Sequence, residues 1–173
     1  MDTTARIVVG TDGSPAAATA VRYALEEAGR RSVPLRVVAA VAVPDYWSEA
    51  LAVARDLPDL PDLRPAARRA AQNQVDEAVA ADPALGGVDV VVDVRDVVAG
   101  SPGRALVEVA AGAELLVVGH RGRGVLGSAI LGSVGLYCVL HATTPVTIVP
   151  ATWSPQRARA TDAHADAHAG AAT

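Results

Sequence analysis

Three kinds of residue are rare or absent in this chain of 173 residues, which contains no lysine, no phenylalanine and a single cysteine. Its 15 basic residues are therefore all arginines, and a phosphate-binding loop of the G-x-x-x-x-G-K-[ST] type is excluded because that motif requires a lysine. Aromatic residues make up only 3% of the chain, so we expect any bound base to lie between aliphatic side chains. The single thiol, Cys138, cannot form an internal disulfide, which favours a reducing compartment and a packing role inside an apolar helix.

Charge and hydropathy exclude two further classes of partner. The formal net charge is −4, which offers no basic face to nucleic acid or to an acidic membrane surface. The most apolar segment, residues 125–140, is shorter than the ~20 residues of a membrane-spanning helix and is interrupted by glycine and serine. The first residues lack the layout of a signal peptide, so we expect a cytoplasmic protein.

What the chain does contain is a regular alternation of short apolar runs and helical patterns. The apolar runs predict strands at residues 6–11, 35–43, 88–95, 114–119 and 146–149. Apolar residues at helical spacing predict helices at residues 15–29, 65–81, 102–111 and 133–141. This alternation is typical of a doubly wound α/β fold, so we expect a five-stranded parallel, Rossmann-like sheet with helices on both faces.

Length and composition also predict the domain organisation. The length is that of one domain, which we place at residues 1–150. Residues 151–173 contain no large apolar side chain beyond Trp153, so we expect a disordered tail. The proline-rich, acidic connection at residues 44–64 predicts a lid or a variable surface loop.

The most informative pattern is a glycine-rich loop between the fourth predicted strand and the last predicted helix. Residues 118–122 read VGHRG, and residues 132–134 read GSV, which gives the spacing G-x2-G-x9-G-[ST]. Glycines let backbone N–H groups approach a polyanion, and the free N–H groups at the start of the following helix would face the same anion. A glycine-rich loop alone is more often only a connection, but its place between a strand and a helix favours a phosphate site.

This spacing resembles the phosphate-binding signature of the ATP-binding branch of the universal stress protein family. Residues 7–15 (IVVGTDGSP) are similar to the family's first strand and turn, and residues 145–149 (PVTIV) to its last strand. The resemblance implies the strand order 3-2-1-4-5, which places the turns after strands one and four on one crevice. Two departures from the family pattern are Glu114, where aspartate is usual, and Ala40, where histidine is common.

The resemblance also implies which residues hold the nucleotide. Glycine and backbone groups of the loop would hold the phosphates with Arg121, Asp12 would bind the ribose or a metal on the phosphates, and Val41 would present backbone groups to adenine. On residues alone, Asp12 is more commonly a turn residue that binds its own backbone, and Val41 is one more buried strand residue. The full set is Gly10, Thr11, Asp12, Val41, Val118, Gly119, Arg121, Gly122, Gly132, Ser133 and Val134.

The histidines predict no catalytic centre. His120 lies in the loop as a phosphate donor or a solvated side chain, and His141 lies at a helix end. His164 and His168 have the spacing of metal ligands if the tail is helical, but a disordered tail is favoured. We therefore expect no metal site from protein side chains alone, and a divalent ion, Mg²⁺ or Mn²⁺, only on the phosphates of ATP.

The resemblance implies an ATP-binding regulatory or sensor protein of the stress response. Slow ATP hydrolysis, or binding of another adenine nucleotide such as cyclic AMP or AMP, remain alternatives. Residues 146–149 form a short, uncharged, strongly β-forming strand that would lie at an edge of the sheet. A homodimer through this strand is therefore expected, as is common in the family.

Overall fold

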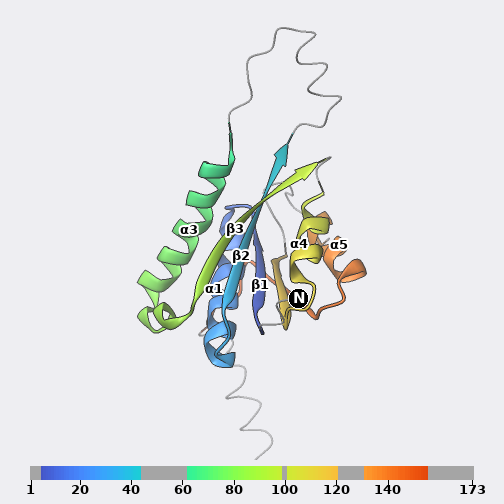
Figure 1. Cartoon of the computed structure of the whole chain (residues 1–173). Helices are drawn as coiled ribbons and strands as arrows, with labels where there is room; N and C mark the ends of the chain where they lie inside the picture. The colour runs from blue at the N-terminus through green and yellow to red at the C-terminus, as the bar shows by residue number, and fades with distance from the viewer. Residues whose placement is uncertain (1–4, 44–61, 99–100, 121–130, 156–173) are drawn as a thin grey trace, which may run out of the picture.

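The structure, a computed structural model, describes residues 5–43, 62–98, 101–120 and 131–155. The strands are β1 (Ile7–Thr11), β2 (Leu35–Val43), β3 (Val90–Val98), β4 (Leu115–Gly119) and β5 (Val146–Val149). The helices are α1 (Pro15–Arg31), α3 (Arg64–Ala81), α4 (Pro102–Ala110) and α5 (Ser133–His141), with a short 3-10 helix, η1 (Pro83–Gly87). All neighbouring strands pair in parallel in the order β3-β2-β1-β4-β5 (Figure 1). The expected fold class and strand order are confirmed.

The sheet separates two apolar cores, because alternate side chains of each strand point to opposite faces. On one face, Ile7 and Val9 of β1 pack with α1 and α3, and on the other, Val8 packs with α4 and α5. The central strands β1 and β4 are therefore covered on both sides (Figure 1). This explains why these two strands read as continuous apolar runs rather than as alternating patterns.

Helix α1 begins as its sequence predicts but ends later. Ser14 is the N-cap, its Oγ accepts a hydrogen bond from Ala17 N at 3.2 Å, and proline follows at the first helical position. The helix continues past the predicted end at Gly29 to Arg31, and Ser32 closes it in the left-handed conformation with φ 55°. Glycine near a helix end costs only ~1 kcal/mol, and arginines in the last turn favour continuation.

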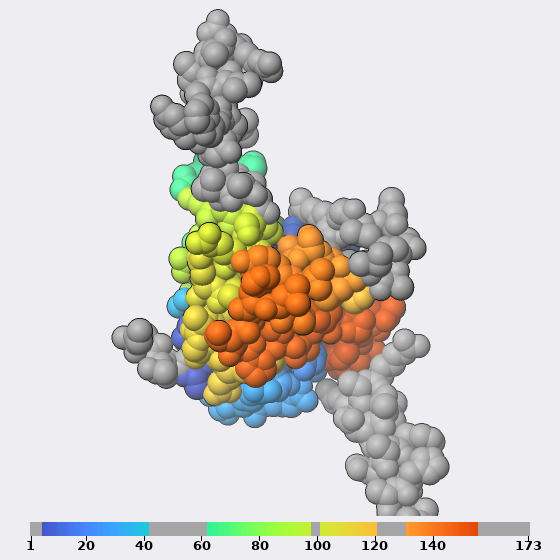
Figure 2. All heavy atoms as spheres, turned by 90° about the vertical axis from the view of Figure 1, so that its right-hand side faces the viewer, coloured from blue at the N-terminus to red at the C-terminus, as the bar shows by residue number. Residues whose placement is uncertain are grey.

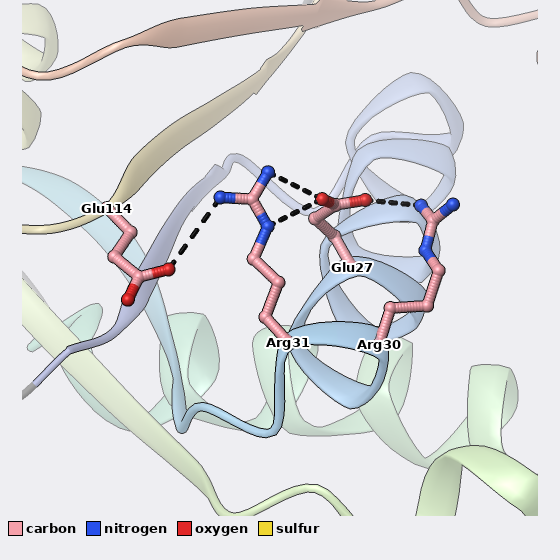
Figure 3. Close-up of polar contacts among 4 residues, drawn as sticks. All are labelled: Glu27, Arg30, Arg31 and Glu114. Atoms are coloured by element: carbon pink, nitrogen blue, oxygen red, sulfur yellow. Dashed lines mark hydrogen bonds and ion pairs between the residues drawn. The ribbon is translucent and has the colours of Figure 1, made fainter.

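Those arginines form an ion-pair cluster at the amino ends of the strands (Figure 3). Glu27 binds both Arg30 and Arg31, and Arg31 also lies 3.7 Å from the carboxylate of Glu114. Hydrogen bonding to Glu27 raises the pKa of the Arg31 guanidinium. Glu114, one of the two departures from the family pattern, therefore joins α1 to the start of β4, at the opposite end of the sheet from the glycine turns.

The third strand differs from its prediction at both ends. It spans Val90–Val98 rather than 88–95, because η1 occupies the residues before it and Val88 serves as the C-cap of η1. The strand then runs beside the whole of β2, from Leu35 paired with Val90 to Val43 paired with Val98. Pairing with β2 thus set the boundaries that local sequence did not reveal.

The described chain continues beyond the predicted domain end at residue 150. Trp153 packs against the core beneath α1, and its ring meets that of Tyr23 edge to face with centroids 5.2 Å apart. Residues 151–155 are therefore part of the described structure, and residues 156–173 are not among the described residues. Among the described helices, none has the length and hydropathy of a membrane span.

Candidate functional site

The candidate site lies at the carboxyl ends of the strands, where the strand order reverses between β1 and β4. The connection after β1 leads to α1 on one face of the sheet, and the connection after β4 leads to α5 on the other. In doubly wound folds, ligands bind at this switch point because the diverging connections leave a crevice. The turn after β1 and the end of β4 at Gly119 both lie at this point.

The turn after β1 is held by its own side chains. Thr11 Oγ1 accepts a hydrogen bond from Gly13 N at 3.1 Å, and Asp12 Oδ1 accepts one from Ser14 N at 2.9 Å. Gly13 has a φ of +76°, a conformation that favours glycine. Asp12 is exposed, and it binds the backbone of its own turn, which is the more common role of an aspartate at such a position. A turn contact through Oδ1 is compatible with ligand binding, because a carboxylate accepts several hydrogen bonds.

A residue that the sequence analysis did not identify joins this turn to α3. Gln74 is 7% exposed; its Oε1 accepts a hydrogen bond from Thr11 Oγ1 at 2.6 Å, and its Nε2 donates to Ser14 O at 3.0 Å. The only sequence signal was a glutamine at an apolar position of the predicted helix, between Ala71 and Val75, both of which are buried.

Gly10 has a structural explanation that does not involve a ligand. It lies within β1, one residue before the strand ends, and a Cβ at this position would come within 2.6 Å of Leu106 of α4. Glycine therefore allows α4 to approach the sheet closely. The turn itself begins after Thr11, the last residue of β1.

The strand β2 extends past β1, which exposes part of its backbone. Thr11, the last residue of β1, is in register with Ala39, so residues 40–43 of β2 continue beside β3 alone. If β1 were longer, Gly13 N would donate a hydrogen bond to β2. In the structure it donates to Thr11 Oγ1 instead. The edge of β2 beyond Ala39 therefore faces the crevice.

The hydrogen-bond pattern shows which residues of β2 face that crevice. Ile7 N of β1 donates to Pro34 O, and Leu35 N donates to Asp89 O on the β3 side. Because backbone groups of successive residues alternate between the two edges of a strand, even-numbered residues of β2 face β1 and odd-numbered residues face β3. The backbone groups beside the crevice are thus those of residues 40 and 42, while Val41 is paired toward β3.

A pocket of about 430 Å³ lies between these elements. Its wall on one side is formed by small side chains of α3, and on the other by the turn after β1 and the end of β2. Val41, 8% exposed, contributes to it. The lining residues are Thr11, Asp12, Gly13, Ala39, Ala40, Val41, Leu63, Ala66, Ala67 and Ala70. No aromatic ring is among them, so a flat base would contact aliphatic side chains, as the composition predicts.

The helix that follows the glycine loop begins beside the end of β4. Gly132 is the N-cap of α5, with φ −61° and ψ 153° and no side-chain cap, and Ser133 is the first helical residue. Gly132 N donates to His120 O at 3.2 Å, and His120 N donates to Val149 O at 2.8 Å. The two ends of the loop are therefore held together, and the amino end of α5 lies next to the last residue of β4, Gly119.

The remaining predicted site residues divide into two groups. Val118 is 3% exposed and packs in the core beside α4, so only its backbone is near the crevice, and Val134 packs partly against the same core. Arg121 and Gly122 lie outside the described residues.

Among the residues that the structure does describe, no cluster of three or more histidine, cysteine, aspartate or glutamate side chains could hold a metal ion.

Cys138 is fully buried in the core between α4 and α5. Burial raises the pKa of its thiol to about 11, so the thiol is protonated at neutral pH. The packing role predicted for it is consistent with both observations.

The comparison with known families identifies the chain. The sequence model of the universal stress protein family matches residues 3–150. This chain belongs to the universal stress protein family. A universal stress protein of Mycobacterium tuberculosis is 39% identical over 148 residues, which are 84% of this chain and 45% of the relative. One of Mycolicibacterium smegmatis is 35% identical over 146 residues, or 83% and 45%. The chain thus spans about half the length of these curated relatives.

Solved structures of universal stress proteins have the same fold. One in complex with cAMP is 30% identical, with a TM-score of 0.57, and the match covers 86% of this chain and 98% of that chain. One from Archaeoglobus fulgidus is 25% identical with a TM-score of 0.57, covering 84% and 98%. A third, from Archaeoglobus fulgidus in complex with dAMP, is 23% identical, with a TM-score of 0.52 and coverage of 84% and 97%, and is similar in fold.

Proposed function

We propose that this universal stress protein binds an adenine nucleotide at the switch point of the sheet, with ATP carrying Mg²⁺ or Mn²⁺ as the expected ligand. The observation that carries the proposal is the amino end of α5, which starts at an N-cap without a side chain beside the end of β4. A helix of nine residues concentrates partial positive charge and free N–H groups at this end. Phosphate groups are suited to such a position.

The exposed edge of β2 supports adenine as the base. The carbonyl of Ala40 and the N–H of Ala42 are successive groups on the edge that faces the crevice. Adenine presents an amino donor next to a ring-nitrogen acceptor, which complements a carbonyl followed by an N–H. Guanine presents an acceptor next to a donor in the same positions, which would place acceptor against acceptor and donor against donor and leave all four groups unpaired.

A second candidate is an adenine nucleotide with fewer charges, either cAMP or AMP. It is favoured by one observation, that a universal stress protein 30% identical to this chain was solved in complex with cAMP. In both cases the base would bind the edge of β2. The two candidates differ in the phosphate charge that they place at the amino end of α5. ATP places more negative charge there and gains more from it.

Calorimetric titration of the full chain tests these proposals. We expect ATP with Mg²⁺ to bind with one nucleotide per chain, more tightly than AMP and at least tenfold more tightly than GTP with Mg²⁺, a difference of about 1.4 kcal/mol. Equal affinities for ATP and GTP would refute the proposal that the edge of β2 recognises the base. Tighter binding of cAMP than of ATP would establish the second candidate.

We further propose that the protein acts in the cytoplasm as a nucleotide-dependent regulator of the stress response rather than as an efficient ATPase. Hydrolysis requires a group that positions or deprotonates the attacking water next to the γ-phosphate. Near the amino end of α5, the described residues offer only His120 and the hydroxyl of Ser133, and Asp12 is engaged in its turn. This set supports binding, with slow hydrolysis as the remaining alternative.

The two edges of the sheet differ in a way that supports a homodimer through β5. At the β3 edge, Arg68 of α3 donates to Val92 O at 2.8 Å, and the strand carries Asp93, Arg95 and Asp96. Charged side chains and an occupied carbonyl discourage pairing with another strand. The β5 edge carries no charged residue, so a second copy could pair there.

The surface beside β5 adds to this argument. The outer face of α5, drawn in orange in Figure 2, carries Leu136, Val139 and Leu140, which are 47%, 50% and 68% exposed. They are spaced at i, i+3 and i+4 and so lie on one side of the helix. A helix with apolar residues on its outer side as well as its inner side is better suited to an interface than to water.

A further inference from the structure

Gln74 links α3 to the turn on both sides of Asp12. Its side chain accepts a hydrogen bond from the hydroxyl of Thr11, the residue before Asp12, and donates one to the carbonyl of Ser14, two residues after Asp12. Gln74 is 7% exposed and both hydrogen bonds are buried, so they are shielded from water. Buried side-chain amides are costly unless their hydrogen bonds are made, so this pair of contacts constrains where the turn can lie.

The two elements that Gln74 joins are opposite walls of the pocket. The turn contributes Thr11, Asp12 and Gly13, and α3 contributes small side chains from the same helix as Gln74, including Ala67 and Ala70. The bonds that the turn makes within itself, from Gly13 N and Ser14 N, fix its internal shape. They do not fix its distance from α3, whereas the bonds of Gln74 do.

We propose that Gln74 is a positioning residue of the nucleotide site, which sets the width of the pocket by holding the Asp12 turn against α3. The inference rests on the proposed function, because it assigns a role within the same site. Gln74 acts through Thr11 and Ser14 rather than by touching the ligand. Its loss should therefore weaken the base and ribose end of the site and leave the phosphate end at α5 unchanged.

The test compares Gln74→Leu with Gln72→Leu, which makes the same chemical change two residues away on the same helix. Gln72 is exposed and binds Asp76, outside the pocket. We expect Gln74→Leu to lower the affinities for AMP and for ATP by the same factor, about tenfold, because both ligands contain the same base and ribose. Gln72→Leu should bind both like the wild type. Melting temperatures of all variants are measured in parallel.

The ligand dependence separates positioning from stability alone. If Gln74 only stabilises the fold, Gln74→Leu lowers the melting temperature but binds AMP and ATP like the wild type at 25 °C, which overturns the inference. If the affinity for ATP falls by a larger factor than the affinity for AMP, the effect lies at the phosphate end of the site at α5. That result would also overturn the inference. If the wild type binds neither nucleotide, the proposed function itself is wrong, and this inference with it.

A second pair of variants decides the matter if Gln74→Leu does not fold. Thr11→Ser keeps the hydroxyl that donates to Gln74, and Thr11→Val replaces it by a methyl group of similar size, which also removes the acceptor of Gly13 N. We expect Thr11→Val to bind AMP about tenfold more weakly than Thr11→Ser. Equal affinities of the two folded variants would overturn the proposal.

Discussion

Substitutions at Gly132 distinguish the effect of charge on nucleotide affinity from any effect on the stability of α5. Gly132 has φ −61° and ψ 153°, which any residue adopts, so a side chain introduces no backbone strain. Aspartate and asparagine are both favoured over glycine at an N-cap, by a few tenths of a kcal/mol. We therefore expect Gly132→Asp and Gly132→Asn to melt at or slightly above the wild-type temperature.

The nucleotide affinity should change in the opposite direction. Either side chain can accept hydrogen bonds from the N–H groups that the phosphates would use, and aspartate also repels them. Two unit charges ~4 Å apart interact with ~1 kcal/mol in bulk water and ~4 kcal/mol at an effective dielectric constant of 20. A loss of at least tenfold, about 1.4 kcal/mol, lies at the lower end of this range. The expected order of ATP affinity is wild type, then Gly132→Asn, then Gly132→Asp.

Calorimetry at two salt concentrations completes this experiment. The difference between Gly132→Asn and Gly132→Asp should shrink as ionic strength rises, because salt screens the repulsion. Gly87→Asp is the matched control, since Gly87 lies in η1 before β3, and a Cβ there would meet nothing within 4 Å. A folded Gly132→Asp variant that binds ATP as tightly as the wild type would refute the assignment of α5 to the phosphates.

Three further predictions concern activity, assembly and the thiol. Phosphate release from ATP should be far slower than the median enzyme turnover of ~10 per second; a rate near that value, abolished by His120→Ala, would make the protein an enzyme. Thr147→Lys in β5 should shift a dimer toward monomer in analytical ultracentrifugation, whereas Thr143→Lys, before the strand, should not; a wild type that is monomeric at tens of micromolar would exclude this interface. Cys138, whose pKa is raised to about 11, should react with a disulfide reagent at pH 8 only as fast as the protein opens; rapid labelling of the native protein would contradict its burial.

The fold could be predicted from sequence because its signals are local. The apolar runs of buried parallel strands, the Ser14-Pro15 helix start and the glycine-serine helix start at Gly132 each depend on neighbouring residues, and all three recur in the structure. The end of α1 and the bounds of β3 were missed because they depend on ion pairs and on the length of β2. Such boundaries are set by tertiary partners that no local window contains.

The candidate site was predictable only in part, for the same reason. The glycine pattern located the turns, but the role of Gly10 depends on Leu106, which lies 96 residues further along the chain. The two bonds of Gln74 span 63 and 60 residues, and its sequence neighbours gave no indication of them. The direction in which Val41 presents its backbone follows from strand register, which the sequence does not display.

The burial of Val149 also limits how the dimer can be tested. Val149 is 1% exposed and packs in the core beneath α1, so a charged residue at this position would unfold the protein rather than separate subunits. Thr147, which is only partly buried, is the suitable position in the same strand.

Amide hydrogen exchange of the full chain, measured with and without ATP and Mg²⁺, shows where the nucleotide binds. We expect slower exchange in three separate segments: the turn at residues 11–14, the edge of β2 at residues 40–42 and the start of α5 at residues 132–136. Exchange at η1, before the amino end of β3, should not change. Unchanged exchange in all three segments at saturating ATP, or protection at η1 instead, would contradict the proposed site.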